Sequence, residues 1–133
     1  MRILGIDPGS RITGYGLINT RGSQLEFVAC GTIRTAGEKD FSRRLLVIFS
    51  DLSEIIRSYE PEAAAVEEVF LARLQVFNYS PRRVKQTVAG YGHADKAQIQ
   101  YMVRMLLGLN AAPSSDAADA LALAICHAHH NVI

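Results

Sequence analysis

The sequence lacks the features that would place it in several large classes of protein. It has two cysteines, too few for a disulfide scaffold, and no apolar run approaches the ~18 residues of a membrane span. Its first residues show no charged region, apolar stretch and cleavage site in succession, so we expect a cytoplasmic protein with no membrane association. Lys and Arg number 14 against 13 Asp and Glu, so overall charge does not indicate nucleic-acid binding.

The cysteines and clustered histidines have ordinary structural explanations. Cys30 and Cys126 lie in apolar stretches without CxxC spacing and are predicted to be buried free thiols. His127, His129 and His130 end the last predicted helix, where a histidine suits the helix dipole. No cysteine or histidine cluster elsewhere joins them, which argues against a metal site there.

Apolar periodicity and turn residues predict an α/β layered domain with a mixed sheet, in one unit spanning residues 1–133. The expected strands are 2–7, 12–20, 24–33, 63–70 and 74–79. Helices are expected from a cap at Asp40 or Ser42 to about 59, and over 80–88, 95–107 and 116–130. The first three strands form an antiparallel meander, and helices alternate with strands after it.

The first helix has a clear apolar face, which we expect to contact the core. Its members recur at helical spacing: Leu45, Leu46, Phe49, Leu52, Ile55 and Ile56.

One connection between strands is too short. Only residues 71–73 separate the strands 63–70 and 74–79, whereas parallel neighbours need a crossover of about a dozen residues or more. Either the two strands pair antiparallel, or a crossover helix is missing from this chain.

Two of the predicted strands carry acidic residues in positions that suit a binding site. Asp7 ends the first strand, and ligands gather at strand ends in α/β sheets, although this aspartate could simply brace the following turn. Glu67 and Glu68 interrupt an apolar strand and point to opposite faces. A buried glutamate is costly unless it is paired or ligated, but a solvated strand end would also accommodate both.

Asp116 and Asp119 are spaced i, i+3 and therefore share one face of the last predicted helix. They could serve only as a cap and as partners of the helix dipole. The residues around them, 117–122, are small and apolar. Such a helix can pack closely on a sheet and direct both acids toward the strand ends.

A site that brings several carboxylates together needs cations to offset their repulsion. All-oxygen ligation favours Mg²⁺, with Mn²⁺ as a substitute. Two ions about 4 Å apart can bind the attacking and leaving oxygens of a phosphodiester, which points to hydrolysis of nucleic acid.

Basic and aromatic residues near the acids would complete such a site. Four cations on two short helices could stabilise phosphate charge or position the backbone, although solvated helix faces are the simpler explanation: Arg82, Arg83, Lys85 and Lys96. Phe70 could belong to the core or stack on an unpaired base. Arg43 and Arg44 form a separate basic pair.

Four segments in order resemble the RuvC family of bacterial Holliday-junction resolvases. They are ILGIDPGSRITGYG at 3–16, VEEVF at 66–70, VKQTV at 84–88 and DAADALA at 116–122. Each is weak alone, but the ordered set spans nearly the whole chain. The resemblance implies a ribonuclease-H-like three-layer fold with a five-stranded mixed sheet flanked by helices. It further implies a metal-dependent homodimeric endonuclease that resolves four-way DNA junctions by symmetric paired nicks in homologous recombination and repair.

The resemblance also implies roles for single residues. Asp7, Glu67, Asp116 and Asp119 would be the catalytic, metal-binding acids, with Glu67 rather than Glu68 at the family's position and two ions per site. Lys85 and Lys96 would assist at the phosphates, Phe70 would stack on a base near the crossover, and Arg82 and Arg83 would add DNA contacts. A branch-migration helicase complex would be a further partner.

The chain departs from the family after the Phe70 motif and also lacks the basic tail that some relatives carry, and two other functions stay open. The family has a longer segment after the Phe70 motif, and its dimer is built on a crossover helix in that segment. The sequence therefore does not decide whether this chain dimerises. An inactive junction-binding module is one alternative. The other is an actin- or sugar-kinase-like phosphotransferase, whose first phosphate loop the turn after Asp7 resembles. Those proteins carry two such domains, and this chain has room for one.

Overall fold

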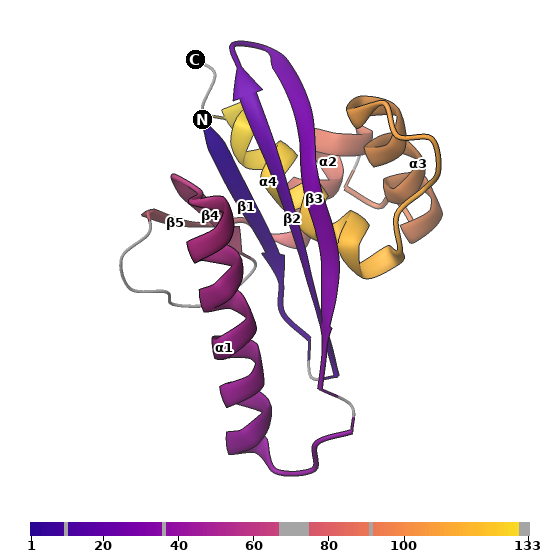
Figure 1. Ribbon diagram of the computed structural model, residues 1–133. Coiled ribbons are helices and arrows are strands. Elements are labelled where there is room, and N and C mark those ends of the chain that lie inside the picture. The colour runs from indigo at the N-terminus through magenta and orange to yellow at the C-terminus, as the bar shows by residue number, and fades with distance from the viewer. Residues whose placement is uncertain (10, 36, 67–74, 91, 131–133) are drawn as a thin grey trace.

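The computed structural model describes residues 1–9, 11–35, 37–66, 75–90 and 92–130. The described strands are β1 (Arg2–Asp7), β2 (Ile12–Arg21), β3 (Gln24–Arg34), β4 (Ala63–Val66) and β5 (Gln75–Asn78). The described helices are α1 (Phe41–Tyr59), α2 (Pro81–Ala89), α3 (Lys96–Leu107) and α4 (Ser115–His130) (Figure 1). Their order and approximate bounds agree with the prediction.

The five strands form one mixed sheet in the order β3-β2-β1-β4-β5. β1 pairs antiparallel with β2, and β2 with β3, whereas β1–β4 and β4–β5 are parallel pairs. The parallel pairing of β4 with β5 excludes the antiparallel alternative for these strands. The predicted end of the fourth strand, at Phe70, lies outside the described residues.

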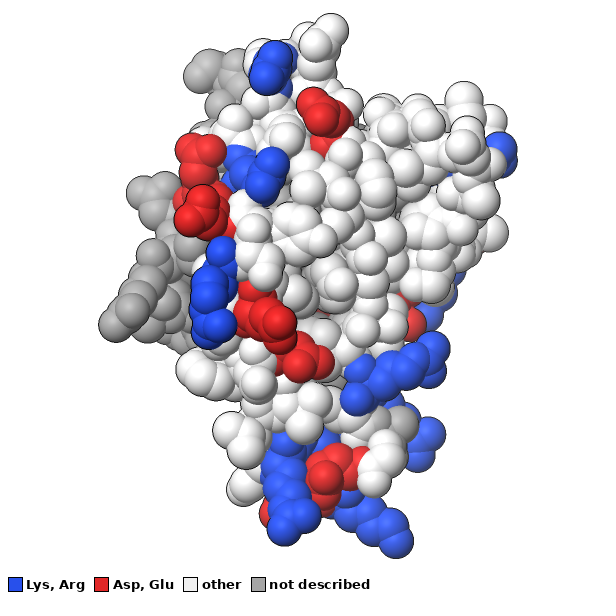
Figure 2. All heavy atoms as spheres, in the orientation of Figure 1, with Lys and Arg blue, Asp and Glu red and all other residues white. Residues whose placement is uncertain are grey.

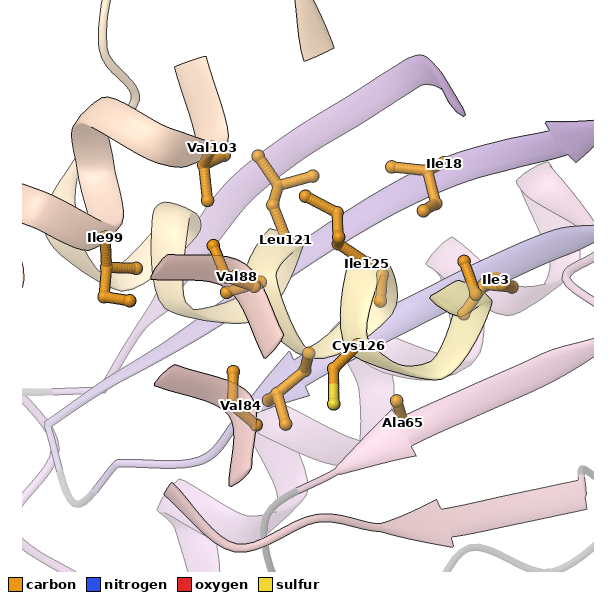
Figure 3. Packing of buried hydrophobic residues seen from close by; sticks show 14 of the residues in the cluster. Ile3, Ile18, Ala65, Val84, Val88, Ile99, Val103, Leu121, Ile125 and Cys126 are labelled. Carbon is orange, nitrogen blue, oxygen red and sulfur yellow. The ribbon is translucent and has the colours of Figure 1, made fainter. Parts of the chain in front are cut away.

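Helices cover both faces of the sheet, so the three-layer arrangement is confirmed. α4 lies on one face, with α2 and α3 packed on its outer side, and Figure 3 shows side chains of α4 between those of the two outer helices and Ile3 and Ile18 of the sheet. Ile3 and Ile18 from the sheet contact the same apolar cluster as Leu121 and Ile125 from α4. α1 covers the opposite face, where Leu52 joins a second cluster that includes residues of β1, β2 and β4.

The prediction that Leu45, Leu46 and Phe49 contact the core is wrong. They are 51, 65 and 65% exposed, and Leu52 is the only buried residue of α1. The first half of α1 extends toward an end of the molecule rich in charged side chains (Figures 1 and 2). Helical periodicity identified the apolar face of α1 but not which part of that face is covered.

The cysteines are free, as predicted, although Cys30 is only half-buried whereas Cys126 is buried. Burial raises the pKa of both thiols. Within the part of the chain that the structure describes, no helix is both long and apolar enough to cross a bilayer.

Candidate functional site

A cavity of about 210 Å³ brings four of the predicted site residues together from four different elements. Asp7 comes from the end of β1, Lys85 from α2, Lys96 from the start of α3 and Asp119 from α4. Its other lining residues are mostly apolar: Pro81, Val84, Ile99, Ala122 and Leu123. The cavity thus offers two carboxylates and two ammonium groups above an apolar floor.

Asp7 reaches this cavity because β1 ends there. It is half-buried and pairs across the sheet with Gly14 of β2. A Cβ atom on Gly14 would collide with the backbone carbonyl of Asp116, so the sheet touches the first turn of α4 directly at this point. The strand register therefore places the end of β1 beside the start of α4.

Two further glycines keep α4 close to the sheet. Gly5 and Gly16 are cross-strand partners, and a Cβ atom on Gly5 would overlap the carbonyl of Ala120. A Cβ atom on Gly16 would lie 2.5 Å from a methyl group of Leu121. Because Asp119 is the residue before this contact, the glycines fix its distance from the strand that carries Asp7. The sequence contained this signal, as glycines within the strands and a run of small residues in the helix.

Asp116 does not cap α4, which removes the simplest structural explanation for it. The backbone N–H of Ala117 donates to Oγ of Ser114 at 3.3 Å, so the serine is the capping acceptor. Asp116 lies one turn before Asp119 and is likewise half-buried, but it is not among the residues that line the cavity.

Lys85 projects from the face of α2 that also carries Pro81 and Val84 into the cavity. The adjoining side of this segment is attached to the C-terminal half of α4 by three polar contacts. These are Tyr79 Oη to His127 Nδ1 at 2.8 Å, Arg83 Nε to His130 Nε2 at 3.1 Å, and Cys126 Sγ to Thr87 Oγ1 at 3.6 Å. α4 therefore carries Asp119 near its start, and its C-terminal half holds α2, the helix that carries Lys85.

His130 and His127 both contact neighbouring groups. The Nε–H of Arg83 donates to His130 Nε2 at 3.1 Å, and His130 Nδ1 lies 2.7 Å from the carbonyl oxygen of Cys126. His127 is buried, and burial, with a smaller contribution from His130, lowers its pKa. Its Nε2 atom is buried without a hydrogen-bond partner. The buried imidazole is hydrogen-bonded to Tyr79, so its role is structural, although a neutral ring does not gain the helix-dipole interaction that its position predicts.

Lys96 owes its position to a capping box. The side chain of Asp95 accepts from the N–H of Gln98 at 2.8 Å, and the Gln98 side chain accepts from the N–H of Asp95 at 2.9 Å. The reciprocal pair fixes where α3 starts, and Lys96 is its first residue. The predicted cap at Asp95 is confirmed.

The other predicted contacts lie elsewhere. Arg83 is directed toward the end of α4, with its guanidinium 5.9 Å from the centre of the Tyr79 ring. Arg82 is exposed and packs its aliphatic stem near Gly92. Glu67 and Phe70 lie outside the described residues, so their proposed roles stay predictions.

The donor atoms of the described acids are of the type that a hard divalent cation prefers. Asp7 and Asp119 supply carboxylate oxygens from two elements to one cavity, which is the ligand chemistry of Mg²⁺ or Mn²⁺. Within the described ranges, no group of three or more His, Cys, Asp and Glu side chains is close enough to hold a metal ion. A complete ligand set therefore needs a further donor, and Glu67 is the predicted one.

A three-layer α/β fold with acids at the end of β1 and on α4 is that of the ribonuclease-H-like nucleases. The chain belongs to the RuvC family: the family model described as crossover junction endodeoxyribonuclease RuvC matches residues 3–74 and 72–127. The crossover junction endodeoxyribonuclease RuvC of Marinobacter nauticus is 49% identical over 152 residues, which cover 97% of this chain and 86% of that protein.

Solved structures agree with the sequence comparison. The structure of Thermus thermophilus RuvC matches with a TM-score of 0.90 and 33% identity, covering 99% of this chain and 96% of that one. T. thermophilus RuvC in complex with Holliday junction substrate matches with a TM-score of 0.86 at the same identity, covering 98% and 94%. Both likenesses extend over nearly the whole chain.

Proposed function

We propose that this chain is a metal-dependent endonuclease that resolves four-way DNA junctions by symmetric nicks during recombination and repair. The observation that carries the proposal is the single cavity lined by Asp7, Asp119, Lys85 and Lys96. Family membership supports the substrate, because the relatives are crossover junction endodeoxyribonucleases and T. thermophilus RuvC has been solved with a Holliday junction. An inactive junction-binding module would not need acids in this cavity.

Asp7 and Asp119, with Asp116 and Glu67, would hold divalent cations, with Mg²⁺ as the expected ion and two ions per site. Bound there, the ions would lower the pKa of a water nucleophile and neutralise charge on the phosphate. The choice of Glu67 over Glu68 rests on the family resemblance.

The two lysines that line the cavity would act on the phosphate. Lys85 is half-buried, lines the cavity and lies on a helix attached to α4 through Arg83 and Thr87, so it is suited to stabilising charge that develops on the phosphate. Lys96 is exposed at the cavity rim and is suited to positioning the DNA backbone. Arg82, Arg83 and Phe70 remain secondary candidates for DNA contact.

The test compares cleavage of a synthetic four-way junction with cleavage of a linear duplex of the same sequence in Mg²⁺. We expect junction-selective nicking that is lost with a chelator and restored by Mg²⁺ or Mn²⁺. Asp7→Asn should reduce the cleavage rate on the order of 10³-fold or more while sparing junction binding, which basic residues supply.

Asp51→Asn is the matched control, because it makes the same chemical change at an exposed site on α1. It should cleave at the wild-type rate. Equal cleavage of junction and duplex by the wild-type chain, or unchanged cleavage by Asp7→Asn, would show that the proposed function is wrong.

The β4–β5 connection bears on the proposed homodimer. The family model matches in two overlapping pieces that meet at residues 72–74, and the M. nauticus alignment runs over 152 positions although this chain has 133 residues. Both facts support the proposal that the family's crossover segment is absent here. Pairing of two copies and association with a branch-migration helicase complex, like cytoplasmic location, remain predictions from the resemblance and the sequence.

A further inference from the structure

We infer that a basic surface at the Asp7 end of the sheet binds the sugar–phosphate backbone of a junction arm outside the catalytic cavity. Five cations from the β1–β2 connection, the end of β3 and the start of α1 form this surface, here called the basic end: Arg11, Arg34, Lys39, Arg43 and Arg44. The inference rests on the proposed nuclease function and adds the path that DNA takes beyond the cavity.

The strand register brings two of these cations together. Arg11 follows the turn after Asp7, and the next residue, Ile12, pairs with Arg34 at the end of β3. Thr35, directly after β3, donates to the carbonyl of Arg11 from its backbone N–H at 2.8 Å and from its hydroxyl at 3.2 Å. Arg11 and Arg34 are thus neighbours at the sheet end where β1 delivers Asp7, and both are exposed.

The start of α1 is attached to the same end. The N–H of Glu38 donates to the carbonyl of Thr35 at 3.0 Å, and Asp40 then caps α1 by accepting from the N–H of Ser42 at 3.1 Å. Lys39 and Arg43 are exposed on either side of this cap. Figure 2 shows Lys and Arg side chains gathered at the lower end of the molecule, where Figure 1 places the start of α1.

The charge balance of this surface is positive, and helix stability does not explain it. Glu38 and Asp40 are the acids within it, against five cations, and the Asp40 carboxylate is engaged as the cap. Arg43 and Arg44 lie in the first turn of α1, which contains no acid. Cations at a helix N-terminus oppose the helix dipole, so contact with a negatively charged partner molecule is the better account of the exposed Arg43.

The chemistry of the basic end suits a nucleic acid. Duplex DNA carries one negative charge per about 1.7 Å of its axis, so a strand leaving the cavity presents phosphates to any adjoining cation. Phe41 is 66% exposed within the surface, and the guanidinium of Arg44 lies 6.0 Å from the centre of its ring. Cations interleaved with an exposed aromatic ring on one side of a nuclease fit contact with a DNA arm.

The test measures junction binding without metal as a function of salt, by fluorescence anisotropy, for two matched pairs of substitutions. Lys39→Gln with Arg43→Gln removes two charges from the basic end. Arg21→Gln with Arg57→Gln removes two from the far end of β2 and the last turn of α1. The first pair should bind roughly 10- to 100-fold more weakly at 0.1 M salt, with a salt slope shallower by about 2. The second should match the wild type.

Shortening the junction arms adds a second readout. Wild-type affinity should fall as the arms are shortened, whereas the affinity of Lys39→Gln with Arg43→Gln should depend less on arm length. Equal binding by the two pairs of variants would show that the basic end does not bind a junction arm, and would leave the proposed function standing. Failure of the wild-type chain to prefer a junction over a duplex would instead overturn the proposed function, and the arm contact with it.

Discussion

The helices on the two faces of the sheet, α4 and α1, are packed in opposite ways. Every residue of α4 from 120 to 128 is buried, although most of these side chains are small. α1 is longer and carries larger apolar residues, yet Leu52 is the only one of them that is buried. Gly5, Gly14 and Gly16 admit the backbone of α4 on one face of the sheet, whereas large apolar side chains in the first half of α1 stay exposed on the other.

Close packing serves the site because it limits movement. α4 carries Asp116 and Asp119, and its approach to β1 sets where these acids lie relative to Asp7. The loosely packed start of α1 bears no cavity residue and belongs to the basic end, where contact with flexible DNA needs less geometric accuracy. Rigid packing around the acids therefore suits metal-dependent cleavage, and looser packing at the basic end suits contact with a DNA arm.

The largest effect is expected from Gly5→Ala, which removes the space that α4 occupies. The new Cβ atom would overlap the carbonyl of Ala120, so the helix must shift away from β1. We expect the free energy of unfolding to fall by about 2–4 kcal/mol, measured by urea denaturation, with junction cleavage reduced further than stability alone explains.

Gly22→Ala is the control for this prediction. Gly22 has a φ of 59° in the β2–β3 turn and open space around it, so its replacement costs only about 1 kcal/mol of backbone strain and spares cleavage. Similar losses in the two variants would contradict the claim that contact with α4, rather than glycine content, is what matters.

Local signals in the sequence were enough to predict the elements, and the acids of the cavity were singled out as well. Strand and helix bounds follow from turn residues, caps and periodicity, all of which act over a few positions. Asp7 was found because a strand end is visible in the sequence. Contacts between distant segments could not be predicted from one sequence, because they depend on how those segments are aligned in space. Examples are the approach of α4 to Gly5 and Gly14 and the hydrogen bond between Tyr79 and His127.

A smaller effect on stability is expected from alanine substitutions at two leucines of α1. Leu52→Ala deletes a side chain that is 6% exposed and should cost about 2–3 kcal/mol of unfolding free energy. Leu45→Ala makes the same change at a position that is 51% exposed and should cost under about 0.5 kcal/mol. Urea denaturation of both variants checks the expectation. A loss at Leu45 as large as that at Leu52 would mean that the first half of α1 is covered in solution.

The smallest effect concerns the pH dependence of the C-terminal half of α4. The pKa of His127 is lowered in the folded chain, mainly by burial and then by His130, so the unfolded chain binds the proton more readily. Stability from the neutral ring is therefore present above the unfolded pKa of about 6.5 and is lost as pH falls through the folded pKa. His127→Gln, which keeps a hydrogen-bonding group for Tyr79, should flatten this decline in denaturation curves between pH 7 and 5. His129→Gln, at an exposed position, should retain it. Equal slopes in the two variants would show that His127 is not the group responsible.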